Sequence, residues 1–356
     1  IFIYCIAQRD FSVLKRMHWL SGLAVFFLIS APWFYFVMKA NPEFFDKFFI
    51  YEHFTRFTTK QHGRYQPWYY FIPILLSGML PWTLLMLDTL WRTWRTNVLP
   101  SKVFNAAHFL LIWSVFIYLF FTASGSKLPS YLLPIFPALA LLMGKRIAEM
   151  SAQTLLKQIA PVILFVIAIV VLALNVGKLA DTPLQKELYP QYTIWLVVAS
   201  LALLAGLLGS MWLLLREQKM IAVAILAISS LLFGQIGLSG YNVLASERSA
   251  KHIAAAIAPK LKAGVPFYSV LDYEQTLPFY LKRTFTLVQY RDEMGFGLGQ
   301  EPQRWIPTVE EFAPVWAAQK EAYAIIRVHD YPQMQQLGLA MQIIFQDSQN
   351  IVVKKL

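Results

Sequence analysis

The sequence predicts a mainly α-helical membrane protein, with a polytopic transmembrane helix bundle over residues 1–240 and a small soluble α/β domain over residues 245–356. The chain has 356 residues, of which 57% are hydrophobic and only 14% are charged, whereas an average soluble domain has about 25% charged residues. The composition excludes a disordered or collagen-like chain. The single cysteine, Cys5, also excludes a disulfide scaffold.

The bundle is predicted from apolar stretches, because a helix of about 20 apolar residues crosses the core of a bilayer. Seven stretches have this length: 18–38, 67–90, 105–123, 131–147, 158–176, 191–215 and 220–240. Residues 1–7 look like the end of an earlier, partial span. Since the sequence begins inside that apolar run, we expect an N-terminal part that precedes Ile1.

Charge predicts the orientation of the bundle. Residues 1–240 hold 19 Lys and Arg against 9 Asp and Glu, whereas residues 241–356 hold 12 against 11. Short cytoplasmic loops carry the excess of positive charge in membrane proteins. The basic short loops are 8–17, 91–104, 145–157 and 216–219. The loop 39–66 and the C-terminal domain are therefore expected outside, with membrane lipids as partners and no nucleic acid.

The C-terminal domain alternates β-rich runs with helical ones, which is typical of an α/β fold. The predicted strands are 264–271, 283–290, 321–328, 341–346 and 350–356. The predicted helices are 246–262, 274–281 and 308–319.

An interfacial helix is predicted outside the membrane at about 42–60. On a wheel of 100° per residue its Phe side chains share one side, and Glu52 and Arg56 form an i, i+4 pair in or beside that aromatic face. Charged groups there are costly unless they are paired or functional. One interpretation is a structural ion pair, with cations reaching lipid headgroups. The other is half of a binding site, in which Glu52 or His53 handles protons or a metal and Arg56 holds an anion.

A second external cation, Lys127, follows the turn formed by residues 124–126. Pro129, Pro134 and Pro137 are expected to interrupt the following span and to free backbone carbonyls. Lys127 is either a membrane-surface anchor or a phosphate contact beside Tyr131. Because Arg56 and Lys127 are predicted at the same depth and both lie beside aromatic residues, they are candidates for one lipid-phosphate site.

Five segments resemble the bacterial aminoarabinose transferase family, which belongs with the protein mannosyltransferases in the GT-C class. They are residues 51–57 (YEHFTRF), 66–70 (QPWYY), 80–82 (LPW), 126–131 (SKLPSY) and 273–280 (YEQTLPFY). The resemblance covers nearly the whole chain, and its first and fourth segments are fairly specific for the family. It implies the C-terminal portion of a GT-C-like bundle with a periplasmic α/β domain, in the bacterial inner membrane.

The resemblance implies an inverting glycosyltransferase that uses a sugar on undecaprenyl phosphate. In the aminoarabinose branch the acceptor is lipid A, and the modification confers polymyxin resistance. Arg56, Lys127 and Tyr131 would then hold the donor's phosphate and head group, and Glu52 would support Arg56. His53 is a candidate site residue and metal ligand, although a divalent metal is only an option and no other cofactor is implied. The general base is expected in the N-terminal part, so this portion alone should be inactive.

Two other functions stay open at this stage. A related GT-C enzyme would move mannose or another sugar to protein or glycan, and the sequence does not separate these acceptors. A transporter or flippase for lipid-linked sugars would carry charges near the middle of its spans. Here the polar residues gather at the outer ends of the spans, which favours chemistry at the interface. A scaffold whose external domain only binds a partner is a third option.

Overall fold

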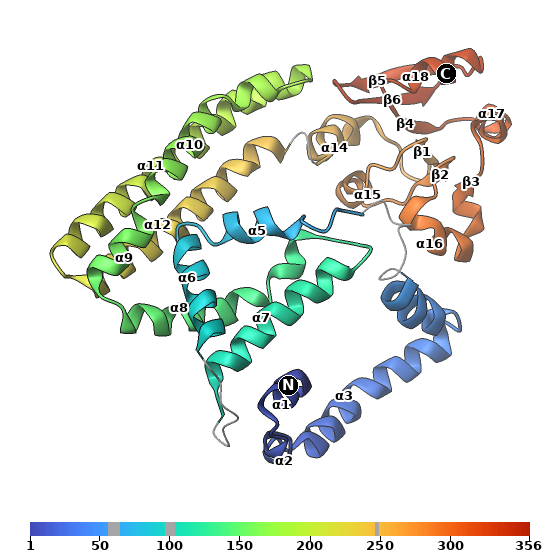
Figure 1. The fold of residues 1–356 in the computed structure, drawn as a ribbon. Helices are drawn as coiled ribbons and strands as arrows, with labels where there is room; N and C mark the ends of the chain where they lie inside the picture. The colour runs from blue at the N-terminus through green and yellow to red at the C-terminus, as the bar shows by residue number, and fades with distance from the viewer. Residues whose placement is uncertain (56–64, 97–103, 246–248) are drawn as a thin grey trace. The chain divides into compact units, whose positions relative to one another are not determined.

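The computed structural model describes residues 1–55, 65–96, 104–245 and 249–356, and most of these residues are helical (Figure 1). The earlier helices are α1 (Phe2–Gln8), α2 (Ser12–Arg16), α3 (Trp19–Ala40), α5 (Phe71–Gly78), α6 (Thr83–Arg95), α7 (Ala106–Ala123), α8 (Ile135–Glu149) and α9 (Ala152–Ile159). The long apolar helices that follow are α10 (Val162–Leu174), α11 (Pro183–Leu215) and α12 (Lys219–Gly240). Short 3-10 turns are η2 (Pro129–Leu132), η3 (Val176–Leu179) and η4 (Tyr241–Leu244).

Contacts divide the chain into two compact units. Residues 1–167 and 203–231 form one, and residues 168–202 and 232–356 form the other. The long helices α10 to α12 thus contribute residues to both units. The predicted division into domains near residue 240 stays a prediction.

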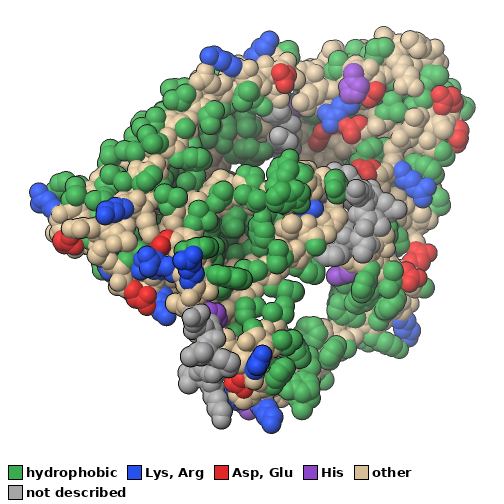
Figure 2. Space-filling view, in the orientation of Figure 1, with side chains coloured by type: hydrophobic (Ala, Val, Ile, Leu, Met, Phe, Trp, Pro, Cys, Tyr) green, Lys and Arg blue, Asp and Glu red, His purple; other side chains and the backbone are tan. Residues whose placement is uncertain are grey.

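Five segments among the described residues are long and apolar enough to cross a membrane, and a sixth is possible if a bent helix pair counts as one span. They are 19–40, 106–123, 152–174, 183–215 and 219–244. Figure 2 shows hydrophobic side chains covering the long helices, with Lys and Arg mostly near helix ends. The described chain is therefore that of a multi-pass membrane protein.

Two of the seven predicted spans are not straight helices of the expected length. The stretch 67–90 is α5 and α6, which meet at a bend of 110°. The stretch 131–147 corresponds to α8, which has only 15 residues and follows the turn η2. The prolines explain this second difference, because Pro129 and Pro134 lie where η2 and α8 begin, positions at which the missing N–H costs little.

The C-terminal domain contains a six-stranded sheet in the order β3-β2-β1-β4-β6-β5. The strands are β1 (Phe267–Val270), β2 (Thr286–Val288), β3 (Trp305–Ile306), β4 (Tyr323–Arg327), β5 (Met341–Gln346) and β6 (Asn350–Lys355). The first four run parallel, whereas β6 runs antiparallel to both β4 and β5. Each of the five predicted strand segments contains one of these strands.

Helices cover both faces of this sheet (Figure 1). They are α14 (Lys251–Ile257), α15 (Thr276–Leu281), α16 (Gly295–Gln300), α17 (Val309–Ala318) and α18 (Tyr331–Gln336). Three short turns accompany them, η5 (Ala258–Lys260), η6 (Asp292–Met294) and η7 (Pro302–Arg304). Alternate residues of β1 face opposite cores, since Tyr268 packs with α17 and Phe267 packs with α14 and α15. Buried strands with helices on both faces are typical of a parallel sheet.

Candidate functional site

The segment before Lys127 folds into a buried serine turn. Helix α7 ends at Ala123. The two serines that follow are buried, with 5% of Ser124 and 4% of Ser126 exposed. The Ser124 hydroxyl donates to the carbonyl of Ser126 at 3.0 Å, and it accepts from the Ser126 N–H at 3.3 Å. This local bonding replaces helical bonds and fixes the path of the chain into residue 127.

Lys127 is buried, with only 5% of its surface exposed. Its Nζ donates to the carbonyls of Ser124 at 2.8 Å and Gln66 at 3.0 Å, and it lies 5.5 Å from the centre of the Tyr65 ring. Among the described residues no carboxylate forms an ion pair with it. Burying a cation is costly unless it is paired, so this burial does not favour the interpretation of Lys127 as an anchor that reaches lipid headgroups. Its position at the membrane surface stays a prediction.

The arrangement around Lys127 is suited to an anion. An ammonium has three N–H donors, and two of them point to carbonyl oxygens. Within the described ranges the buried hydroxyl of Ser126, the preceding residue, has no hydrogen-bond partner. A phosphate oxygen would accept from both groups and would supply the negative charge that the buried ammonium lacks.

Tyr131 lies in the turn η2, four residues after Lys127, and it is half-buried. Its ring stacks on Phe121 with the ring centres 4.7 Å apart and the planes at 29°. The two residues come from opposite sides of the serine turn, so the stacking holds α7 against η2. The phenol is thereby fixed in the same segment as Lys127.

The prolines after Lys127 lie at and near the start of α8, and a side chain contacts the backbone there. The indole N–H of Trp113 donates to the carbonyl of Pro134 at 3.1 Å, and Pro137 lies in the first turn of α8. The predicted span 131–147 is thus interrupted near its start, between η2 and α8. That freed carbonyls line a polar cavity there stays a prediction.

The predicted interfacial helix is a π-helix, η1 (Asp46–Thr55). A π-helix bonds residue i to i+5, so its side-chain neighbours differ from those on an α-helical wheel. Glu52 lies 3.8 Å from the Nζ of Lys47, five residues earlier. The predicted α-helical face of Glu52 was therefore derived with the wrong period.

His53 shows the same spacing. Its Nδ1 is 2.6 Å from the carbonyl of Phe48, and its ring lies 5.0 Å from the Phe48 ring and 6.3 Å from the Phe49 ring. The side chain is exposed apart from these contacts. The Phe48 carbonyl fixes Nδ1 and leaves Nε2 as the ring nitrogen that can meet another group.

The other predicted site residue, Arg56, falls in 56–64, outside the described residues, so its pairing with Glu52 and its distance from Lys127 stay predictions. The structure does join two of the sequence motifs, because Lys127 contacts Tyr65 and Gln66. Sequence reasoning did not find these two partners. The only signal was the position of Gln66 at the start of the QPWYY segment.

The described residues do not form a metal centre. No group of three or more His, Cys, Asp or Glu side chains gathers anywhere in the described ranges. Glu52 is engaged by Lys47, and one ring nitrogen of His53 is engaged by a carbonyl. The role of His53 as a metal ligand stays a prediction, and no chemical step is assigned to a metal.

Comparisons with known proteins place this geometry in a family. Residues 253–355 match the family described as "Aminoarabinose transferase C-terminal domain". Over its full length the chain superposes on the crystal structure of ArnT from Cupriavidus metallidurans bound to undecaprenyl phosphate, with a TM-score of 0.90 and 31% identity, and it covers 64% of that chain. The apo form of the same protein gives a TM-score of 0.87.

The chain belongs to the aminoarabinose transferase family. Similar sequences agree with this. An undecaprenyl phosphate-alpha-4-amino-4-deoxy-L-arabinose arabinosyl transferase 1 of Pseudomonas fluorescens strain Pf0-1 is 37% identical over 153 residues, which are 42% of this chain and 26% of that protein. The protein of the same description from strain Pf-5 is 28% identical over 287 residues, which are 79% of this chain.

Membership of the aminoarabinose transferase family confirms two predictions, the resemblance and the mainly helical fold with a small C-terminal sheet domain. The chain spans half of the Pf-5 relative's length. The activity named for these longer relatives is therefore only proposed for this chain.

Proposed function

We propose that this chain is part of an integral-membrane glycosyltransferase of the bacterial inner membrane. It moves 4-amino-4-deoxy-L-arabinose from undecaprenyl phosphate to lipid A at the periplasmic face, where its C-terminal domain lies. The names of the relatives and the full-length likeness to a structure bound to undecaprenyl phosphate support this substrate class. The observation that carries the proposal is the buried Lys127, whose ammonium contacts carbonyl oxygens and no carboxylate of the described chain.

Lys127 acts on the donor in this reaction. The anomeric carbon of the sugar is displaced from the lipid phosphate, so negative charge builds on the departing phosphate oxygen. A cation fixed before the reaction stabilises this charge more in the transition state than in the ground state, which is the condition for acceleration. Lys127 is fixed in this way, because two carbonyls and the burial hold its ammonium in place.

The other candidate residues support the same phosphate. Arg56 supplies a second cation, and its planar guanidinium suits bidentate contact with phosphate. Tyr131, held by Phe121, contacts the head group. In this proposal Glu52 on η1 supports Arg56, and His53 on the same helix lines the site. The general base that accepts the proton of the lipid A hydroxyl is not assigned to a residue of this chain.

Mass spectrometry of lipid A tests this function. Lipid A from cells with the intact gene is compared with lipid A from cells without it, and a mass increase of one aminopentose is expected only with the gene. A hexose increase, or an unchanged lipid A, would contradict the proposal. The hexose result would favour the related enzyme that moves another sugar.

The residues are tested in the full-length protein. Arg56→Ala and Lys127→Ala are expected to abolish sugar transfer while the protein still inserts into the membrane. Lys178→Ala is the matched control, because Lys178 is an exposed lysine in another short connection. Wild-type transfer by both test variants would remove the phosphate site from the proposal.

A further inference from the structure

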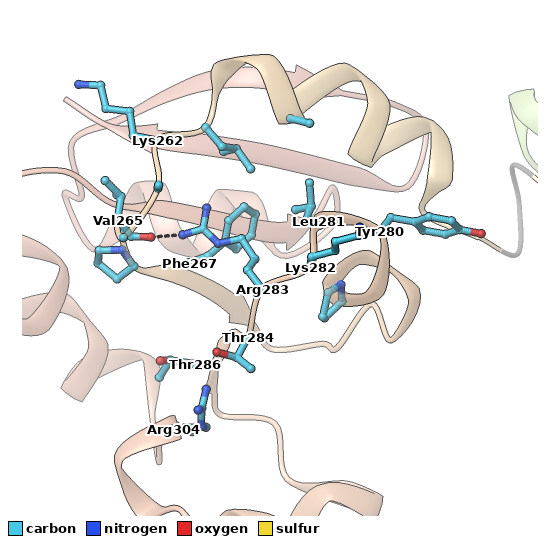
Figure 3. A pocket seen from close by; sticks show the side chains of 16 residues that line it. Lys262, Val265, Phe267, Tyr280, Leu281, Lys282, Arg283, Thr284, Thr286 and Arg304 are labelled. Carbon is cyan, nitrogen blue, oxygen red and sulfur yellow. Dashed lines mark hydrogen bonds between the residues drawn. The ribbon is translucent and has the colours of Figure 1, made fainter.

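The C-terminal domain has a large pocket that the proposed reaction does not use. Its volume is about 1020 Å³, close to the upper end of the range of about 300–1,000 Å³ for small-molecule sites. It opens at the amino ends of the parallel strands, where the loop before β1, the end of α15 and the start of β2 meet (Figure 3). We call it the basic pocket, because Lys262, Lys282, Arg283 and Arg304 line it and none of the described lining residues is acidic.

Arg283 is the central cation of the basic pocket. It is half-buried, its Nη2 donates to the carbonyl of Val265, and its guanidinium lies 5.6 Å from the centre of the Phe267 ring (Figure 3). Partial burial lowers its pKa below the usual value for arginine. Within the described ranges no carboxylate pairs with it. A guanidinium has five N–H donors, so most of its donors are free for an anion.

The other lining groups add to this site. Lys262 and Arg304 are held by Glu321 and Glu301, which fixes their positions at the rim. Lys282 is exposed and follows the end of α15 in a left-handed conformation with φ 51°.

Two hydroxyls line the same pocket. Thr284 and Thr286 both lie on its wall, and Figure 3 shows them on the side of Arg304, below Arg283. A phosphate has several acceptor oxygens, so cations and hydroxyl donors on one wall suit it.

A mainly apolar pocket of about 280 Å³ adjoins the basic pocket, and its lining also includes Glu301, which pairs with Arg304. The two share Pro278, Thr284 and Arg304 as lining residues. Phe285, Leu287, Met294 and Leu298 line the apolar part. Next to Pro278, the side chain of Phe279 is 77% exposed. A cationic pocket joined to an apolar one suits a ligand with a charged head and a hydrophobic part.

The carboxyl ends of the parallel strands, opposite the basic pocket, are closed. In doubly wound sheets ligands usually bind at the carboxyl ends of the strands, where neighbouring connections run to opposite faces. Here that point lies between β1 and β4, and Arg327 fills it by pairing with Asp272 and, at 3.8 Å, with Glu274. The basic pocket at the amino ends is therefore the open site of the sheet's parallel half.

We propose that the basic pocket binds a phosphate monoester, with Arg283 and Lys282 contacting the phosphate and Thr284 and Thr286 donating to it. The adjoining apolar pocket favours an amphiphile as the carrier of this phosphate over a soluble sugar phosphate. The lining of this site does not include Lys127, and the proposal does not depend on the proposed transfer reaction.

Calorimetric titration of the full-length protein in a neutral detergent tests the site. The probes are dihexanoyl phosphatidic acid, glucose 1-phosphate and dihexanoyl phosphatidylcholine, which carries no net charge. We expect phosphatidic acid to bind at least about tenfold more tightly than phosphatidylcholine. If glucose 1-phosphate binds as tightly as phosphatidic acid, the phosphate site is supported and a soluble ester is identified as its ligand. If glucose 1-phosphate binds more weakly than phosphatidic acid, the amphiphile is identified as the ligand.

Variants decide whether the basic pocket is responsible. Losing a hydrogen bond to a charged group costs enough to weaken binding about tenfold or more, so we expect this for Arg283→Gln. Lys282→Gln, at an exposed position, is a second variant that keeps the fold and is expected to weaken binding severalfold. Lys320→Gln, an exposed lysine outside the pocket, is the matched control and should bind as the wild type does.

Three results would overturn the proposal. They are no binding of either phosphate ester, equal binding of phosphatidylcholine, and affinity unchanged in both Arg283→Gln and Lys282→Gln. Repeating the titration in Lys127→Met separates the two sites. Lys127→Met should still bind phosphatidic acid through Arg283, and this holds whether or not Lys127 has a role in sugar transfer.

Discussion

Replacing Lys127 by methionine tests the proposed role of its charge with little change in side-chain volume. The ammonium is 5% exposed and donates to the carbonyls of Ser124 and Gln66. In Lys127→Met both carbonyls lose a donor, at a cost of about 1–3 kcal/mol each. The variant also removes a buried cation, whose desolvation costs several kcal/mol. Because these two effects oppose each other, we expect the unfolding midpoint to stay near that of the wild type.

The transfer rate should respond much more strongly. Removing one fixed donor that stabilises a developing oxyanion typically costs about 3–4 kcal/mol of transition-state stabilisation, or about 10²–10³-fold in rate. Lys127 provides a full charge as well as a donor, so we expect Lys127→Met to lie at the upper end of this range. Lys127→Arg keeps the charge and should retain more activity than Lys127→Met.

The assay uses full-length protein in detergent with the lipid-linked sugar and lipid A, and mass spectrometry follows the aminopentose adduct over time. Thermal unfolding of each variant is measured in the same detergent, and Lys178→Met is the control. Transfer by Lys127→Met within about threefold of the wild-type rate would show that the charge of Lys127 does not act in the transfer, since the predicted loss is about a hundredfold or more.

Two further predictions concern the C-terminal domain. Phe312 is a residue of α17 and is fully buried in the core. Phe312→Ala should cost about 3–5 kcal/mol of unfolding free energy, measured by denaturant unfolding of the full-length protein. A loss below about 1 kcal/mol would contradict this core assignment. Glu321 bonds to Lys262 and Lys354, which lower its pKa below its usual value of 4.5. Its contribution to stability is therefore present above pH 4.5 and is lost as the pH falls through the lowered folded pKa. Glu321→Gln should flatten this acid-side dependence of the unfolding midpoint, and an unchanged profile would show that the bridges contribute nothing.

The strands of the C-terminal domain were predictable because their signal is local. Runs such as 321–328 and 350–356 combine β-branched and aromatic residues, and both form strands in the structure. Strand β3 has only two residues and α18 has six, which is too short for a periodic pattern to stand out.

The geometry of the candidate site was less predictable. A π-helix has no distinct sequence pattern, so the neighbours of Glu52 and His53 could not be derived from an α-helical wheel. The burial of Lys127 depends on Gln66, which lies 61 residues away in the sequence. Hydropathy describes each segment by itself, and it does not say which distant backbone carbonyl will meet a lysine.

The proposed reaction depends most on Lys127 holding the phosphate of the polyprenol donor. The most direct measurement compares the affinity of the full-length protein for undecaprenyl phosphate and for undecaprenol, in the wild type and in Lys127→Ala. We expect that the wild type prefers the phosphorylated lipid and that Lys127→Ala weakens binding of this lipid at least about tenfold, with the affinity for undecaprenol unchanged. Equal affinities of wild type and variant for undecaprenyl phosphate would contradict the proposed role of Lys127.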